Sequence, residues 1–255
     1  MQVARRFAPP TGRPLGRMAG MLLGGFAALA LLVVAAGWVY THPLKSELRG
    51  ENGVNRWFVH QRTPELNHVA DGGTLLGQTL TGLVVLAVLG VVFALLRRSW
   101  WPLVFVGVLD AGMGLFYLAG TQLDPRQRPP VHILQSGLVP DASFPSGHTG
   151  TATAIAGVAA ALLWAYTRVA AGLLVLLVVV PAYTMVSRLY VGAHHVSDVL
   201  TAFVYAVVWI ALCARLLLPT RSLGVESSGQ DAQEQTQRER EAHRDHDARR
   251  PAEDH

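Results

Sequence analysis

Six long apolar stretches constrain the fold of this chain more than any other feature. They cover residues 20–41, 76–97, 101–120, 148–167, 169–190 and 196–218. Each is close to the roughly 20 residues that an α-helix needs to cross a bilayer. A helix satisfies its own backbone hydrogen bonds, so it is the element that such segments can form in lipid. The sequence therefore predicts an all-α bundle of six transmembrane helices over residues 20–218.

The two ends of the chain differ from this apolar middle. Of the 255 residues, 51% are hydrophobic and 15% are charged, and most of the charge lies near the ends. We interpret residues 1–19 as a basic cytoplasmic segment. The first span is then an uncleaved anchor, because its apolar run is too long for a signal peptide. Residues 219–255 are strongly polar without apolar periodicity, which predicts a disordered cytoplasmic tail.

Basic residues flank the spans in a pattern that predicts their orientation. Arginines precede the first span, follow the second, lie between the fourth and fifth, and mark the end of the sixth. With six spans these positions share one side, which the positive-inside rule makes cytoplasmic. This topology accounts for the net charge of +4, so nucleic acid is not an expected partner. The chain is thus predicted to be a multi-pass protein of the cell membrane whose loops 42–75 and 121–147 and turn 191–195 are extracytoplasmic.

Three polar segments stand out in or beside these outward-facing parts. They are Arg128-Pro129, Pro145-Ser146-Gly147-His148, and Ser187-Arg188 followed by His194 and Asp198. The four-residue spacing of His194 and Asp198 would place both on one helix face, where the carboxylate can fix the tautomer of the imidazole. Arg128 and Arg188 supply planar guanidinium groups that suit phosphate oxygens. Two imidazoles with two guanidiniums are a combination that phosphoryl transfer needs.

In this order and spacing, the segments resemble the signature of the type 2 phosphatidic acid phosphatase (PAP2) superfamily. That signature is Lys-x6-Arg-Pro, then Pro-Ser-Gly-His, then Ser-Arg-x5-His-x3-Asp, and the second and third parts match completely. The resemblance covers residues 20–218 and favours the membrane lipid phosphatase branch over the soluble haloperoxidases. The first part departs from the pattern, because Thr121 stands where the family has lysine. Arg126, two residues before Arg128, could partly replace that charge.

The resemblance implies a role for each site residue. His194 would attack phosphorus to form a phosphohistidine, and Asp198 would hold His194 and steady its charge. His148 would protonate the leaving group and then activate water. The substrate phosphate would be bound by Arg128, Arg188, Ser146, Gly147 and Arg126. Ser146 is also a natural helix N-cap, and Gly147 permits close approach of the backbone to phosphate. Cationic side chains carry the electrostatics, so no metal ion or other cofactor is required.

The sequence thus predicts a membrane enzyme that hydrolyses a lipid phosphate monoester or pyrophosphate at the extracytoplasmic face. Candidate substrates are undecaprenyl diphosphate, phosphatidylglycerophosphate and phosphatidic acid. One alternative is a lipid phosphotransferase, in which a lipid or sugar hydroxyl replaces water at the same phosphohistidine. The other is a non-catalytic membrane scaffold with this fold, weakened by Thr121. Intact His148, His194 and Asp198 argue against the scaffold.

Three further features allow more than one interpretation. The loop 42–75, with Trp57 and Phe58, either covers the site or is an ordinary loop with an interfacial aromatic patch. Asp110 is an acid inside the third span, and such residues are functional candidates. It lies mid-span, away from the outward-facing polar segments, so we favour a structural hydrogen bond. His195 is interpreted as a polar turn residue.

Overall fold

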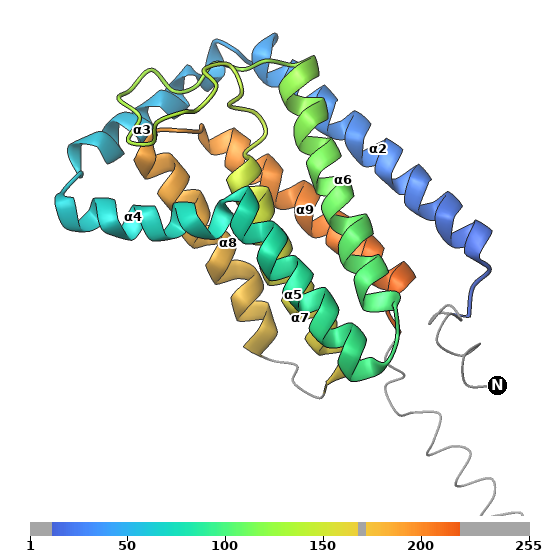
Figure 1. Ribbon diagram of the computed structural model, residues 1–255. Coiled ribbons are helices and arrows are strands. Elements are labelled where there is room, and N and C mark those ends of the chain that lie inside the picture. Colours follow the sequence, from blue (N-terminus) through green and yellow to red (C-terminus); the bar gives the residue numbers. More distant parts are fainter. Residues whose placement is uncertain (1–11, 168–171, 220–255) are drawn as a thin grey trace, which may run out of the picture. The chain divides into compact units, whose positions relative to one another are not determined.

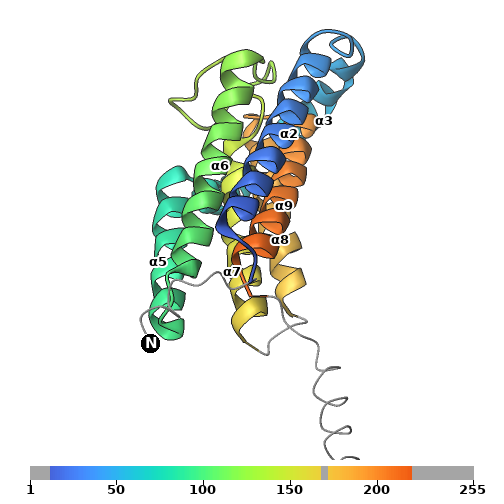
Figure 2. The ribbon, with the colours of Figure 1, turned by 90° about the vertical axis from the view of Figure 1, so that its right-hand side faces the viewer.

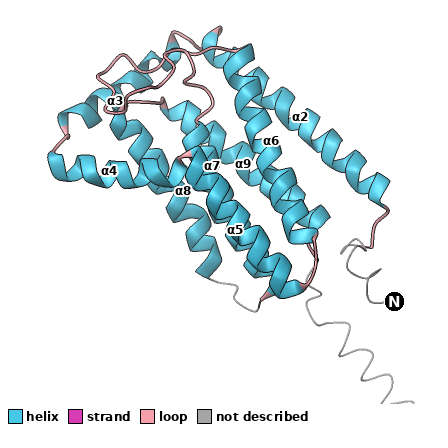
Figure 3. Cartoon of the chain, viewed as in Figure 1, coloured by secondary structure: helices cyan, strands magenta, loops and turns pink. Residues whose placement is uncertain are grey.

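The computed structural model describes residues 12–167 and 172–219, and the regular structure of this part is entirely helical (Figures 1 and 3). Six long helices are present: α2 (Leu15–Thr41), α5 (Thr79–Arg97), α6 (Trp101–Leu123), α7 (Gly147–Tyr166), α8 (Gly172–Val191) and α9 (Val196–Leu217). Each coincides with one predicted apolar stretch to within a few residues. The prediction of an all-α helical bundle is therefore confirmed, whereas the predicted tail lies almost wholly outside the described residues.

Five of these helices are long and apolar enough to cross a membrane, namely α2, α5, α6, α7 and α9. In α8 the apolar segment Val175–Val191 is slightly shorter than a full span. Pro181 lies inside α8, and the helix continues past it, as neighbouring helices allow in membrane bundles. The chain is accordingly a multi-pass membrane protein.

Helix α7 lies at the centre of the bundle and contacts α4, α5, α6, α8 and α9. Half of its apolar window is buried, against 17% for the peripheral α2. The Ala, Gly and Thr residues of α7 permit these close approaches, because lipid-embedded helices associate through tight packing of small side chains. A Cβ on Gly157, for example, would lie 2.5 Å from the side chain of Ile210. Five helices thus pack directly against α7, which lies between α5 and α8 in the view of Figure 2.

An aromatic cluster joins α2, α6 and α9. The rings of Phe26 and Phe116 stack with centroids 4.8 Å apart, and Trp209 meets Phe116 edge-on at 5.6 Å. The indole N–H of Trp209 donates to the carbonyl of Leu109 at 3.1 Å. These contacts fix the rotation of α6 about its axis. They therefore decide which side of α6 faces α5 and α7.

The segment 42–75 is helical, and the prediction of a loop there is wrong. It forms the short 3-10 helix η1 (Glu47–Gly50) and the helices α3 (Glu51–His60) and α4 (Pro64–Gly77). Thr63 caps α4 by accepting a hydrogen bond from the backbone N–H of Leu66, and Pro64 occupies the first helical position. Both helices pack against α8, so tertiary contacts stabilise segments too short and polar to resemble spans. In Figure 1, α4 runs across the direction of the long helices.

The connections near α3 are tied together by backbone hydrogen bonds. In the α6–α7 connection, the N–H of Arg128 donates to the carbonyl of Pro140 at 3.0 Å. The N–H of Leu134 donates to the carbonyl of Val191, at the end of α8, at 3.1 Å. The N–H of Ser146 donates to the carbonyl of Asp198 in α9 at 3.3 Å. The polar segments before α7 and α9 therefore meet at one end of the bundle.

Candidate active site

His194 lies in the turn between α8 and α9. The N–H groups of Gly192 and Ala193 donate to the carbonyls of Leu189 and Arg188, which closes the end of α8. Gly192 has a φ of +80°, a conformation that favours glycine. Helix α9 begins at Val196, so His194 precedes the helix. The expectation that His194 and Asp198 share a helix face is therefore wrong, because the turn needs the residues up to His195.

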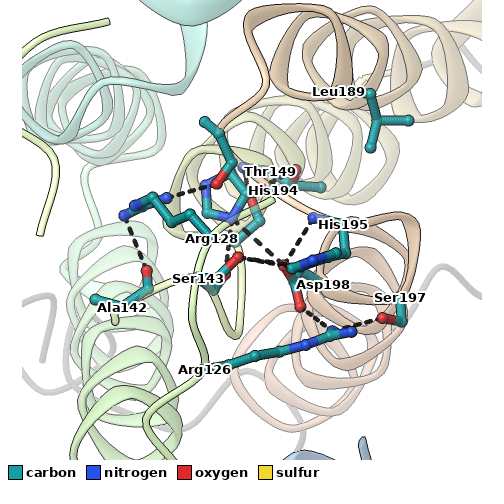
Figure 4. Close-up of polar contacts among 12 residues, drawn as sticks. Arg126, Arg128, Ala142, Ser143, Thr149, Leu189, His194, His195, Ser197 and Asp198 are labelled. Atoms are coloured by element: carbon teal, nitrogen blue, oxygen red, sulfur yellow. Dashed lines mark hydrogen bonds and ion pairs between the residues drawn. The ribbon is translucent and has the colours of Figure 1, made fainter. Parts of the chain in front are cut away.

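The imidazole of His194 is held by a backbone carbonyl. Its Nδ1 lies 2.7 Å from the carbonyl oxygen of Ser143, whereas the nearer carboxylate oxygen of Asp198 is 3.9 Å away (Figure 4). Nδ1–H therefore donates to Ser143, which leaves Nε2 unprotonated and able to attack. His194 thus has the predicted tautomer, with the proton on Nδ1, but the group that holds this proton is a backbone carbonyl and not Asp198. A residue pattern cannot indicate such a partner, because every residue carries a carbonyl.

Asp198 is fully buried and accepts hydrogen bonds from several groups at once. The donors are Nη1 of Arg126 at 2.5 Å, the hydroxyl of Ser143 at 2.6 Å and the N–H of His195 at 2.8 Å. The last contact belongs to a capping box that starts α9, so His195 is a helix cap as well as a turn residue. The carboxylate of Asp198 thus contacts the hydroxyl of Ser143, the same residue whose carbonyl lies 2.7 Å from His194 (Figure 4).

Arg126 is engaged with protein carboxylates. Besides Asp198, its guanidinium contacts Glu51 at 3.2 Å and the hydroxyl of Ser197 at 2.6 Å. Glu51 also accepts from the N–H of Ser197 at 3.1 Å, so it ties the start of α3 to the start of α9. Arg126 does not line the cavity that contains the two imidazoles. This geometry does not support the expected phosphate contact of Arg126, because two carboxylates already take up its charge.

Helix α3 supports the His194 turn from behind. The fully buried Asn55 donates through Nδ2 to the carbonyls of His194 at 3.0 Å and Leu189 at 3.2 Å. The segment 42–75 therefore contacts the site through its polar residues, whereas Trp57 is exposed. Asn55 was not predicted as a site residue. The sequence signal was a polar amide side chain two residues before Trp57 and Phe58.

A cavity of about 270 Å³ brings the three polar segments together. Arg128, His148 and His194 all line it, together with Gly147. The cavity also extends between α5, α6 and α7. Arg128 and His194, which are 66 positions apart in sequence, thus face one volume large enough for a phosphate group and part of its substituent.

The N-terminus of α7 forms one wall of this cavity. Ser146 is the N-cap, as predicted, and its hydroxyl accepts from the N–H of Thr149 at 3.4 Å. Ser146 is buried behind the cavity wall, whereas Gly147 and His148 line it. Nε2 of His148 is buried and lacks a hydrogen-bond partner among the described residues. An unpartnered imidazole beside the free N–H groups of a helix start suits an anionic ligand.

The two arginines differ in how the protein uses them. Arg188 is fully buried, and its Nη1 donates to the hydroxyl of Thr74 at 3.0 Å. Nε and Nη2 of Arg188 have no partner within the described ranges, which is costly for a buried cation unless an anion binds. Arg128 instead donates to three carbonyls, those of Val139, Ala193 and Ala142. Its terminal nitrogens each keep a second hydrogen, and Arg128 faces the cavity directly.

The environment of His194 keeps its imidazole neutral. Burial lowers the pKa of His194 well below its usual value, and the nearby guanidinium of Arg188 lowers that pKa further. Asp198 and the carbonyl of Ser143 oppose this shift without reversing it. A neutral imidazole retains the lone pair that nucleophilic attack requires.

Thr121 does not replace the charge of the lysine in the family signature. It is buried, and its hydroxyl donates to the carbonyl of Tyr117 at 2.9 Å within α6. Thr121 lies one helical turn beyond Tyr117, which lines the cavity. A longer side chain at this position would therefore start on the cavity face of α6. Within the described residues, no three His, Cys, Asp or Glu side chains gather as a metal site.

Comparison with known proteins agrees with this arrangement. Residues 100–221 match the family model of the PAP2 superfamily. The fold is similar to the crystal structure of a transmembrane PAP2-type phosphatidylglycerolphosphate phosphatase from Bacillus subtilis. The TM-score is 0.62 at 24% sequence identity, and the alignment covers 74% of this chain and 93% of the other. No curated protein sequence matches significantly.

Proposed function

We propose that this protein is a membrane phosphatase that hydrolyses lipid phosphate monoesters or diphosphates through a phosphohistidine on His194. The observation that carries the proposal is the shared cavity, in which His194 and His148 meet Arg128 at the start of α7. The superfamily match and the fold of the Bacillus subtilis phosphatase support the same reaction class. Because the Bacillus subtilis protein is a phosphatidylglycerolphosphate phosphatase, phosphatidylglycerophosphate is one candidate substrate of this chain, beside phosphatidic acid and undecaprenyl diphosphate.

The first half of the proposed reaction transfers the phosphoryl group to the protein. Nε2 of His194 forms a bond to phosphorus as the P–O bond to the lipid breaks. The electron pair of that bond remains on the lipid oxygen, which takes a proton from protonated His148. Ser143 keeps the Nδ1 proton of His194 in place, so Nε2 is the nitrogen left free to attack. The lipid alcohol, or the lipid monophosphate where the substrate is a diphosphate, then leaves along the apolar part of the cavity.

The second half returns the protein to its starting state. Water loses a proton to His148 and attacks phosphorus as the P–N bond to His194 breaks. Inorganic phosphate is released, and the electron pair returns to Nε2. The guanidinium groups of Arg128 and Arg188 stabilise the negative charge on the phosphoryl oxygens in both halves. We assign the cavity to the extracytoplasmic face, which the arginine pattern around the spans supports.

Phosphate release from purified protein tests this function. A panel of lipid phosphates and diphosphates is offered in detergent micelles without added metal. We expect release with the native protein and background levels with His194→Ala, because the nucleophile is lost. His132→Ala is the matched control, since His132 is exposed in the α6–α7 connection and does not line the cavity. Equal rates for native protein and His194→Ala would exclude the proposed reaction.

A radiolabelled lipid phosphate tests the intermediate separately. Rapid denaturation should trap label on the native protein in a form that acid removes and base does not, as expected for a P–N bond. His194→Ala should carry no such label. Label that persists in acid would place the phosphoryl group on another residue.

A further inference from the structure

The deep end of the cavity contains polar groups that the proposed hydrolysis does not use. Asp110 and Tyr205 both line it, on α6 and α9. Tyr205 is only 2% exposed, so its hydroxyl has little access to anything except the cavity. Neither side chain has a hydrogen bond to any other residue in the part of the chain that the structure describes.

The position of Asp110 differs from the expectation drawn from its place in the third span. The expected structural hydrogen bond is not found among the described residues. Asp110 also lines the same cavity as His148 and His194, although it lies mid-span. An acid inside a membrane helix is costly and faces a polar partner or a functional cavity. A hydrogen bond within the protein therefore does not explain Asp110. Its carboxyl group instead lines the cavity, where a ligand could contact it.

The depth of these groups follows from helix geometry. A Cβ on Gly147, beside the phosphate end, would lie 3.2 Å from the ring of Tyr117. Asp110 precedes Tyr117 by seven residues, which is about 10 Å along α6. The hydroxyl of Tyr205 is 3.1 Å from the position of a Cβ on Gly150, about 5 Å along α7 from Gly147. The two groups thus lie at successive depths, on the path from the phosphate end into the bundle.

We propose that Asp110 and Tyr205 form a subsite for oxygen atoms in the linkage between the phosphate and the hydrocarbon of the substrate. This inference rests on the proposed function, and it selects glycerolipid phosphates over polyprenyl phosphates. A carboxyl group accepts from a hydroxyl and, when protonated, donates to an ester carbonyl, while the phenol does both. A prenyl chain has no oxygen atoms and would leave both side chains without a hydrogen-bond partner. Burying polar groups in this way weakens binding.

The size of the cavity fits a substrate whose phosphate and polar linkage lie inside it while the hydrocarbon lies outside. About 270 Å³ is below the usual range for pockets that enclose a whole small-molecule ligand. It suits a phosphate and its polar linkage, with the hydrocarbon leaving at the surface. Gly114 and Leu83 line the cavity and are exposed, so the cavity reaches the outside between α5 and α6. The oxygen-bearing part of a glycerolipid would then be the part that lies beside Tyr205 and Asp110.

A ratio of two substrates tests the subsite. Native protein and Asp110→Leu are given a diacylglycerol phosphate and a polyprenyl monophosphate in the same micelles, and kcat/KM is measured for each. We expect native protein to prefer the glycerolipid. The ratio of the two kcat/KM values should fall about tenfold or more in Asp110→Leu, since an unmet polar partner has an effect of this order. Tyr205→Phe should shift the ratio in the same direction.

Stability measurements separate a binding role from a structural one. Asp110→Leu should raise the thermal midpoint, because it removes an unpaired acid from the membrane interior. A structural role for Asp110 predicts the opposite. Gly107→Leu is the control, since Gly107 is exposed on the same helix, has open space around its Cβ position and does not line the cavity. It should leave the ratio unchanged. Its midpoint should rise only by the helix propensity gained when glycine is replaced, and the rise in Asp110→Leu is measured against that value.

The outcomes distinguish this inference from the function on which it rests. Hydrolysis of neither lipid, nor of any other phosphate ester, by native protein would overturn the proposed function itself. Hydrolysis with a ratio that Asp110→Leu and Tyr205→Phe leave unchanged would overturn the subsite alone. If Asp110→Leu cannot be purified, Asp110→Asn and Tyr205→Phe decide the question. Asp110→Asn should then keep at least half of the native ratio, because the amide still offers hydrogen bonds.

Discussion

Two groups of polar residues belong to the candidate site, and they differ in whether the protein itself provides their hydrogen-bond partners. Around Asp198, carboxylate, guanidinium and hydroxyl groups are paired with one another: Arg126, Ser143 and His195 all donate to Asp198. In contrast, His148 and Arg188 have buried nitrogen atoms without a partner among the described residues. We infer that the paired group holds His194 in position, whereas the unpaired nitrogen atoms are available for hydrogen bonds to a ligand.

This contrast has an energetic meaning. Pairing every polar group around Asp198 offsets the cost of burying charges, and it fixes Ser143 and thereby His194. Leaving Nε and Nη2 of Arg188 and Nε2 of His148 without partners costs stability in the free protein. That cost is recovered when an anion binds. Substitutions in the first group should therefore lower stability and activity together, whereas those in the second should lower activity alone.

The largest effect is expected for Asp198→Asn, in the paired group. It leaves the buried guanidinium of Arg126 with Glu51 as its remaining charged partner among the described residues, and breaking a buried ion pair typically costs about 3–5 kcal/mol. Unfolding of the purified protein in a mild detergent should show this loss, together with loss of phosphate release. The double variant Arg126→Met/Asp198→Asn should recover part of the stability and none of the activity. An Asp198→Asn protein of native stability would show that the pairing is not needed for folding.

A matched pair of arginine substitutions sharpens the comparison. Arg188→Lys should reduce kcat/KM about tenfold to a hundredfold with little change in thermal midpoint, since charge-assisted hydrogen bonds contribute about 1.5–3 kcal/mol. Arg128→Lys should lower both quantities, because Arg128 also donates to three backbone carbonyls. Similar changes in thermal midpoint for the two variants would show that an arginine paired with backbone carbonyls and one with unpaired nitrogen atoms contribute alike to stability.

The protonation of His194 is expected to follow from its burial. An ordinary histidine titrates near pH 6.5, whereas burial and Arg188 lower the pKa of His194 well below that value. Below pH 6.5 the unfolded chain therefore takes up a proton that the folded protein does not. The free energy of unfolding should decrease as the pH falls through that region. Nitrogen NMR of the imidazoles, assigned with His194→Gln, should show His194 neutral at pH 6; a protonated ring there would contradict this prediction.

The smallest effect is expected for Thr121→Lys. It restores the cation of the family signature on the cavity face of α6, so phosphate release should rise by a few-fold through stronger charge stabilisation. The buried hydroxyl of Thr121 bonds only within its own helix, and the substitution therefore breaks no tertiary hydrogen bond. Thr121→Met is the control for side-chain length without charge. A fall in activity with Lys and not with Met would show that a positive charge at this position is harmful.

Sequence patterns predicted the long helices well and the connections poorly. Long apolar runs and the Pro-Ser-Gly-His start of α7 depend on local chemistry, namely hydropathy and N-capping by Ser146. The helices α3 and α4 were not foreseen, because contacts with α8 stabilise them. The same contacts bring Asn55 to the His194 turn. Short amphipathic segments carry too weak a local signal to distinguish them from loops.

The sequence by itself determined the helical membrane bundle and the start of α7, and it singled out the two imidazoles that line the cavity, because each depends on neighbouring residues or fixed spacing. Only the tertiary structure decided which groups pair. It assigned Arg126 to carboxylates, gave His194 a carbonyl partner and brought Asp110 to the cavity. Such pairings depend on distances across the bundle, and a backbone carbonyl or a helix rotation leaves no signature in the order of side chains.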